Sequence, residues 1–263
     1  MFHTAMAVLR KDWLTMVRYR NGLVLNAMAP IWQLATFYYL ARAVGPNFQP
    51  EGMPYFLFLL IGSGFYTFLL TGMYSFLRTI QDAQQTGTLE VLMTTSTRPA
   101  VLLILSVISS FSGGLLQLMA FIGGGALVFR HLPAPNLMAC TLVFLLSLLL
   151  AIAAGMFAAG LQLSVHRGSA ALWLFGSSAW LVSGTLFPVA TLPRPIQVLA
   201  NLLPMTHALA GMRLAVLQAQ NRPLLVHEIE VLLLSCLVLV PLSLGFFSWT
   251  VGRARQLGSL SYY

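Results

Sequence analysis

The sequence predicts an all-α membrane protein that crosses the bilayer six times. Hydrophobic residues fill 58% of its 263 positions and charged residues only 8%, whereas soluble domains carry roughly 25% charged residues. Six uncharged stretches each reach the ~20 residues that a transmembrane helix needs. The stretches are continuous rather than short and alternating, which favours helices over a β-barrel. We therefore expect residues 1–263 to form a single transmembrane domain.

The charge balance and the two cysteines exclude other classes. Fourteen basic and six acidic residues give a formal net charge of +8, but so few charges do not make a nucleic-acid-binding face. Cys140 and Cys236 lie in separate apolar runs, without the spacing of a disulfide framework or a metal site. We expect no nucleic-acid partner, and we expect both cysteines to be buried as small hydrophobic residues.

Residues 1–20 predict an amphipathic helix that lies on the cytoplasmic surface of the membrane. Its apolar residues recur at intervals of three and four, as one face of a helix requires. They are Phe2, Met6, Leu9, Trp13 and Met16. Lys11 and Arg18 fall on the other side of the same helix.

The six predicted spans contain no Asp, Glu, Lys, Arg or His. In chain order they are Asn21–Ala41, Gly52–Leu77, Pro99–Phe129, Leu132–Val165, Gly168–Pro193 and Val231–Gly252. A further uncharged stretch, Pro195–Met212, is shorter and contains Pro204, which would interrupt a continuous helix. This stretch predicts short re-entrant or interfacial helices before the last span.

Basic residues near the helix ends predict the orientation, because they stay preferentially on the cytoplasmic side. With the N-terminus inside, nine of the fourteen basic residues are cytoplasmic and five are external. The external five are Arg42, Arg130, Arg194, Arg213 and Arg222. We expect a multi-pass protein of the plasma membrane, the inner membrane in a bacterium, with both termini cytoplasmic and the first span serving as an uncleaved signal.

The segment 82–97, between the second and third spans, predicts a short cytoplasmic helix. Leu89, Leu92 and Met93 are spaced to form a small apolar face beside Glu90. Such a face either docks a partner protein or closes the loop against lipid headgroups, and the spacing favours neither.

Two separated motifs of the chain match the pattern of a known family. The segment Thr86–Leu92 reads Thr-Gly-Thr-Leu-Glu-Val-Leu, and a Thr-Arg-Pro follows it. The segment Ser183–Pro188 reads Ser-Gly-Thr-Leu-Phe-Pro, and a Leu-Pro, a Pro-Met-Thr-His and Arg213 follow it. These motifs resemble the cytoplasmic coupling helix and the stretch after the fifth span of the ABC transporter type-2 permeases, the transmembrane subunits of ABC exporters of type 2. The resemblance covers essentially the whole chain. It departs at Thr86, where the family commonly has a basic residue, so this position cannot supply an ion pair to the ATPase.

The resemblance implies a dimer with a second permease subunit, either this chain or a close paralogue, and two cytoplasmic nucleotide-binding ATPase subunits. ATP and Mg²⁺ would bind to the ATPase, so this chain would hold no cofactor and no metal. The ATPase would dock on Thr86, Gly87, Thr88, Leu89, Glu90, Val91 and Leu92. Residues 188–213 would form an external re-entrant hairpin. Its expected site residues are Gly184, Phe187, Pro188, Pro193, Pro204, Thr206 and Arg213, and Arg213 could pair with Glu228.

The sequence itself also indicates that ATP binding and hydrolysis take place in another subunit. A P-loop needs a lysine to hold phosphates, but the chain's single lysine, Lys11, lies in the amphipathic segment. Ion-coupled transport would normally put ionisable residues near the bilayer midplane, whereas the six acidic residues fall at or outside the ends of the predicted spans. Transport powered by a separate ATPase fits both observations.

The alternative is an integral-membrane enzyme that acts on lipid substrates. Such an enzyme needs a nucleophile with an adjacent base. The candidates are Ser63, Ser178 and Cys140, with His207 or His131 as the base. Small hydroxyl residues in membrane helices more often serve packing, so we expect no catalytic residue.

Aromatic residues of the second span give the candidate pathway. Phe65, Tyr66 and Phe68 lie in the middle of this span, where they either line a path for an amphipathic substrate or contact lipid and neighbouring helices. The predicted function is export of an amphipathic or lipid-like molecule. The sequence leaves open a lipid, a drug, a lipid-linked glycan or a peptide as substrate, and export or lipid flipping as the process.

Overall fold

The computed structural model describes residues 20–85, 114, 117–119, 121–123, 135–165, 168–217 and 222–257. The predicted amphipathic helix before residue 20 and the predicted docking residues Thr86–Leu92 lie outside these ranges. The third predicted span is described only at a few positions between 114 and 123. The described part of the chain is helical and contains no strand.

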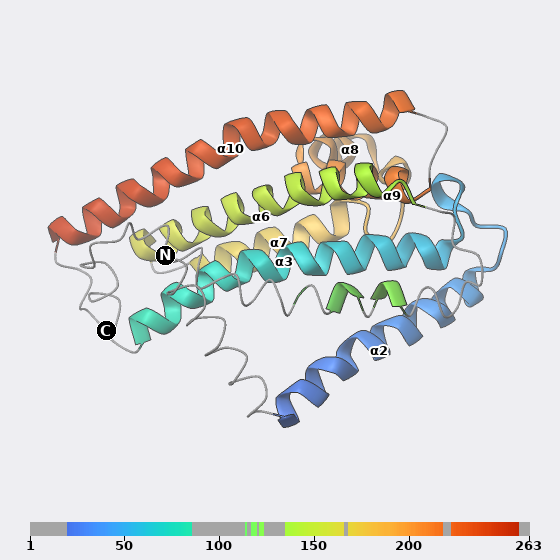
Figure 1. Ribbon diagram of the computed structural model, residues 1–263, viewed down its shortest axis with the longest axis horizontal. Coiled ribbons are helices and arrows are strands. Elements are labelled where there is room, and N and C mark those ends of the chain that lie inside the picture. The colour runs from blue at the N-terminus through green and yellow to red at the C-terminus, as the bar shows by residue number, and fades with distance from the viewer. Residues whose placement is uncertain are drawn as a thin grey trace.

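Three helices of the described part are long and apolar enough to cross a membrane. They are α3 (Tyr55–Gln85), α6 (Leu137–Val165) and α10 (Arg222–Leu257), and they run side by side along the long axis of the molecule (Figure 1). The most apolar part of α3 is 83% buried, against 22% in α10. Helix α3 is therefore the central helix of the bundle, and α10 lies at its periphery.

Small residues on α6 let the central helices approach each other closely. A Cβ atom built on Gly155 would lie 2.6 Å from the ring of Phe76 on α3, so glycine is needed where the aromatic ring crosses α6. Ala151 and Ala159, one turn away on either side, are also buried. Close packing through small residues is the usual way in which membrane helices associate.

Two further helices pack beside the three long ones. Helix α2 (Arg20–Val44) covers the first predicted span and packs against α3. Helix α7 (Gly168–Val182) is only 15 residues long, or about 22 Å, which is shorter than the predicted span Gly168–Pro193. The chain turns at Gly184, whose φ of +82° is in the left-handed region that glycine adopts without strain.

Helix α10 begins at Arg222, earlier than the predicted start at Val231. The prediction stopped at the charged residues that precede Val231. In the structure those residues form the first turns of the helix, where the side chain of Glu228 is paired with His207. A charged first turn is compatible with a helix, although it ends an uncharged stretch.

Short helices gather at one end of the bundle. They are η1 (Pro50–Gly52), η2 (Val189–Thr191), α8 (Arg194–Leu202) and α9 (Pro204–Val216). Helices α8 and α9 lie near the connection between α2 and α3 (Figure 1). The segment Pro195–Met212 thus forms short helices, and Pro204 is the first residue of α9, where a missing backbone N–H costs nothing.

Candidate functional site

Arg213 is the most deeply buried cation of the described residues and joins three segments. It lies on α9 with 2% of its side chain exposed. Its Nη2 atom donates a hydrogen bond of 2.8 Å to the carbonyl oxygen of Gly184 and makes longer contacts with the carbonyls of Phe58 and Thr185. The guanidinium carbon lies 3.5 Å from the centroid of the Phe58 ring, a cation–π contact. Arg213 therefore fastens the turn after α7 to the first part of α3.

Glu51 supplies the negative charge nearest to Arg213. Its Oε1 atom lies 3.7 Å from Nη1 of Arg213, and its side chain is 39% exposed. Burial lowers the pKa of Arg213 to about 10, and the Glu51 carboxylate opposes that shift. Burial raises the pKa of Glu51, while Arg213 acts in the opposite direction. At neutral pH the arginine is still a cation, so the pair holds η1 against α9 as an ion pair.

Gly62 on α3 makes room for the buried guanidinium. A Cβ atom built there would lie in a steric clash with Nη2 of Arg213 and 2.8 Å from the carbonyl oxygen of Thr185. The backbone carbonyl cannot move aside as the end of a flexible side chain can. Gly62 thus serves close packing at this point.

A second pair joins α9 to α10 and α8. Nδ1 of His207 lies 2.6 Å from Oε2 of Glu228, and Nε2 lies 2.8 Å from the backbone carbonyl of Asn201. The hydrogen bond to Glu228 is the main cause that raises the pKa of His207, against the effect of burial. The expected pairing of Arg213 with Glu228 is therefore wrong, because Glu228 pairs with His207 and Arg213 pairs with Glu51.

The other predicted hairpin residues shape the backbone around these pairs. Pro188 precedes η2, Pro193 precedes α8 and Pro204 begins α9. The side chain of Thr206 is buried, and that of Phe187 is half-buried. The hydroxyl of Tyr55, at the start of α3, donates a hydrogen bond of 3.0 Å to the carbonyl of Leu186. The segment 184–213 is thus attached to α3 at two points, Tyr55 and Phe58.

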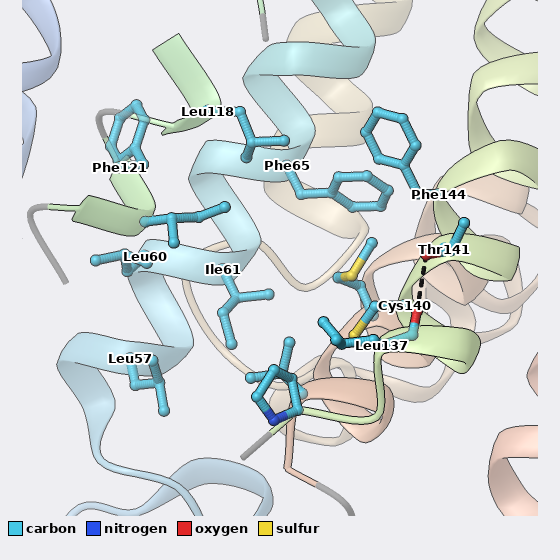
Figure 2. Close-up of a pocket in the computed structure, with 14 residues that line it drawn as sticks. Leu57, Leu60, Ile61, Phe65, Leu118, Phe121, Leu137, Cys140, Thr141 and Phe144 are labelled. Atoms are coloured by element: carbon cyan, nitrogen blue, oxygen red, sulfur yellow. Dashed lines mark hydrogen bonds between the residues drawn. The ribbon is translucent and has the colours of Figure 1, made fainter. Parts of the chain in front are cut away.

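An apolar cavity of about 440 Å³ opens beside this end of the bundle. Figure 2 shows it between α3 and α6, with the side chains of Leu118 and Phe121 forming a further wall. It is lined by Leu57, Leu60, Ile61, Phe65, Leu118, Phe121, Ile122, Pro135, Leu137, Cys140, Thr141, Phe144, Met212 and Val216. None of these side chains is charged. The volume falls within the range of about 300–1,000 Å³ that is typical of small-molecule sites.

The three predicted pathway residues separate in the structure. Phe65 lines the cavity. The hydroxyl of Tyr66 donates a hydrogen bond of 2.5 Å to the carbonyl of Gly176 on α7, and Tyr66 is buried in the core. Phe68 is buried and stacks on Phe144 with ring centroids 5.1 Å apart. Of the three, Phe65 is the residue that the structure brings to the cavity wall.

Ser63, a candidate nucleophile of the enzyme alternative, is buried, and its hydroxyl has no hydrogen-bond partner among the described residues. The other two candidates are Ser178 and Cys140. The hydroxyl of Ser178 donates to the carbonyl of Leu174 at 2.7 Å. Cys140 lines the apolar cavity. Both ring nitrogens of His207 lie against Glu228 and Asn201, so this histidine is not set against either nucleophile. His131 lies outside the described residues.

Glu51, Phe58 and Asn201 were missed by the sequence prediction. Glu51 carried a signal that could have been used, because it is one of only six acidic residues in the chain and charges in such a protein are seldom without a partner. Phe58 and the Asn201 carbonyl carried none, since one is an ordinary aromatic residue of an apolar run and the other acts through its backbone.

Comparison with known proteins places the chain in a family. No curated protein matches it. The family profile described as ABC-2 family transporter protein matches residues 43–247, well over half of the chain. This range includes the cavity and the charged cluster, which consists of the pairs Arg213–Glu51 and His207–Glu228. The chain therefore belongs to the ABC-2 family of transporter proteins and is a multi-pass membrane component of a transporter.

Proposed function

We propose that this chain is the permease subunit of an ATP-driven exporter and moves an amphipathic or lipid-like molecule outward. The observation that carries the proposal is an apolar cavity beside a cluster of ion pairs, in a chain that belongs to the ABC-2 family. An amphipathic molecule has one part that suits each environment. Membership of a transporter family supports transport across the membrane as the process.

The proposed frame has six spans with both termini in the cytoplasm of a bacterial cell. In this frame the three long apolar helices together with α2 and α7 would make five of the six crossings, and α7 would cross together with the turn at Gly184. The third crossing would come from Pro99–Phe129. The excess of basic residues on the inner side supports this orientation. It puts α8 and α9 on the outer side, where residues 188–213 would close the exit of the pathway.

The energy would come from a separate subunit. Members of this family work with an ABC ATPase, and the chain's single lysine is not in a P-loop. We propose that two permease subunits form a dimer and that each ATPase docks on Thr86–Leu92. This segment joins directly to α3, which ends at Gln85. Movement of the ATPase would therefore act first on the central helix.

The mechanism needs two conformations that differ in affinity for the substrate. ATP binding would close the two ATPase subunits and push on the segment after α3. Because α3 is buried along most of its length, its displacement would change the packing against α6 and α9. The cavity and the contacts of Arg213 lie on these surfaces, so both would change with the motion.

Co-purification tests the proposal. The chain and the candidate ATPase subunit are produced together, and the membrane fraction is solubilised and isolated through a tag on the chain. We expect the ATPase to be retained in equal amounts with the permease, and its ATP hydrolysis to respond to added substrate. An integral-membrane enzyme would instead modify lipid in the absence of the ATPase subunit. Lipid-modifying activity of the chain without the ATPase would contradict the proposal.

A further inference from the structure

We infer that the cavity between α3 and α6 binds a single hydrocarbon chain of a lipid, with the headgroup toward the end where Arg213 and His207 lie. The inference rests on the proposed function in one respect, that the bound lipid is the substrate. The family match does not give the class of molecule, which we assign as a lipid. The cavity of one subunit would hold the hydrocarbon chain of this lipid.

The lining selects for hydrocarbon. Apart from Cys140, Thr141 and Met212, every lining side chain is pure hydrocarbon. The hydroxyl of Thr141 already donates a hydrogen bond of 2.8 Å to the carbonyl of Leu137, which Figure 2 draws as a dashed line. Among the described residues, the lining therefore offers no strong hydrogen-bond donor to a ligand.

This chemistry argues against a sugar, a peptide or a headgroup inside the cavity. Each carries hydroxyl, amide or charged groups that would lose water without gaining partners, and burying an unpaired polar group is costly. A hydrocarbon chain loses nothing in this way and gains dispersion contacts with Phe65, Phe121 and Phe144. A dry apolar cavity of this size would otherwise leave its lining without contacts.

The position of the cavity gives the direction of the bound molecule. On α3 the lining runs from Leu57 to Phe65, a rise of about 12 Å. On α6 it begins at Leu137, the first residue of that helix. The cavity therefore starts at the end of the bundle and extends into the apolar spans, as an acyl chain does from its headgroup.

The charged groups lie at the same end. Met212 and Val216 of α9 line the cavity, and Arg213 on the same helix pairs with Glu51. Glu51 is partly exposed and can contact the cationic group of a lipid headgroup. The buried Arg213 holds the Glu51 carboxylate in place. The chain thus offers an apolar slot and a polar end in the order that a phospholipid requires.

Photocrosslinking in the full-length chain tests this inference. The chain is reconstituted in bilayers that contain phosphatidylcholine with a diazirine near the end of one acyl chain. After illumination, the labelled peptides are mapped by mass spectrometry. We expect labels concentrated in residues 57–65 and 137–144. A second lipid with the diazirine on its headgroup should label the segment around Glu51 instead.

Variants on α6 separate the cavity from bulk lipid. Cys140→Trp fills the cavity and should lower labelling of residues 57–65 roughly tenfold, the change expected when about two buried methylene groups are displaced. Leu145→Trp places the same side chain at an exposed position outside the lining and should leave labelling unchanged. Thr141→Val should also leave it unchanged, because the hydroxyl serves the helix and not the ligand. If the tryptophan variant does not fold, Cys140→Leu tests the same direction with a smaller decrease.

Several results would overturn the inference. Labelling that is equal in the wild-type chain and in Cys140→Trp would mean that bulk lipid alone is detected. Crosslinks from the cavity to a second copy of the chain would assign it to the dimer contact, and loss of labelling in Thr141→Val would indicate a polar ligand. Crosslinking needs no ATPase, so its result is independent of the proposed function. Cavity labelling in a chain that does not associate with an ATPase would contradict the exporter function but support the lipid-binding cavity. ATP-driven transport without cavity labelling would support the exporter function but contradict the lipid-binding cavity.

Discussion

Arg213 donates a hydrogen bond of 2.8 Å to the carbonyl oxygen of Gly184, a residue 29 positions earlier in the chain. Both residues belong to the motifs on which the family resemblance rests. The left-handed backbone of Gly184 ends α7 and turns the chain, and the guanidinium then binds that turn to α3. The contact explains in physical terms why a glycine and an arginine so far apart act as one unit.

Removing the guanidinium should destabilise this end of the bundle. Arg213→Ala leaves three carbonyl groups and Glu51 without their cation, and we expect a loss of about 3 kcal/mol in the free energy of unfolding. Arg213→Lys should recover part of the loss, because an ammonium keeps the charge but not the planar group over Phe58. The thermal unfolding midpoint of the purified protein measures both changes.

Arg253→Ala is the matched control, since Arg253 is exposed and its guanidinium carbon lies 5.4 Å from the centroid of the Trp249 ring. We expect its midpoint to stay close to that of the wild-type chain. Equal midpoints for Arg213→Ala and Arg253→Ala would show that the buried contacts contribute nothing to stability.

Gly62→Ala tests the close approach of α3 to the turn after α7. The new Cβ would overlap Nη2 of Arg213 and crowd the Thr185 carbonyl, and such overpacking costs about 1–3 kcal/mol. Gly245→Ala is the control, because a Cβ on this α10 residue meets nothing within 4 Å and alanine favours a helix by up to ~1 kcal/mol. We expect the midpoint to fall in the first variant and to hold or rise in the second. A stable Gly62→Ala protein would disprove the packing role.

The bridge made by His207 predicts a stability that depends on pH. Its ring contacts a carboxylate and a carbonyl, and both only accept hydrogen bonds, so the ring serves both when it carries two protons. The hydrogen bond to Glu228 raises the pKa of His207 above the ordinary 6.5. A raised pKa in the folded state contributes stability below the unfolded pKa, and that contribution is lost as pH rises through the folded value.

We therefore expect the unfolding midpoint to decrease as the pH rises from below 6.5 through the raised pKa of His207. His207→Gln should flatten this dependence, because the amide does not titrate. His227→Gln changes an exposed neighbour on α10 and should keep the wild-type slope. Identical slopes in all three proteins would remove His207 as the source.

How far the sequence predicts this fold depends on which property sets each boundary. The apolar runs placed the start of α3 and both ends of α6 within a few residues, since the need to bury a long uncharged segment sets these boundaries. Helix α3 continues to Gln85, past the predicted end at Leu77. The same criterion failed at α7, because the turn at Gly184 is as free of charge as the helix before it. It also failed at α10, because residues such as Glu228 end an uncharged stretch without ending a helix.

Partners within the charged cluster were beyond prediction from sequence. The motif resemblance singled out Arg213, and the scarcity of acidic residues could have singled out Glu51. Neither observation fixes which acidic residue pairs with which basic residue. Glu228 could have served either Arg213 or His207 on the basis of sequence spacing alone. The fold decides between them by setting His207 on the face of α9 toward α10 and Arg213 on the face toward α3.

Charge reversal in the proposed docking segment should uncouple transport from ATP hydrolysis. Glu90→Arg or Leu89→Gln changes the small apolar face or the charge beside it, and we expect loss of substrate-dependent stimulation of the ATPase while membrane insertion is unaffected. Glu230→Arg reverses an exposed charge near the start of α10, at the end proposed to be external, and should keep the stimulation. Normal coupling in both docking variants would contradict the docking assignment.

The most direct test of the account is ATP-dependent movement of a lipid in sealed proteoliposomes that contain the chain and its ATPase subunit. A fluorescent phospholipid starts in the leaflet that faces the ATPase, and its appearance in the other leaflet is followed by quenching. We expect transfer that requires ATP and falls in the Cys140→Trp variant. Transfer at the same rate without ATP, or chemical conversion of the lipid in place of its transfer, would contradict it.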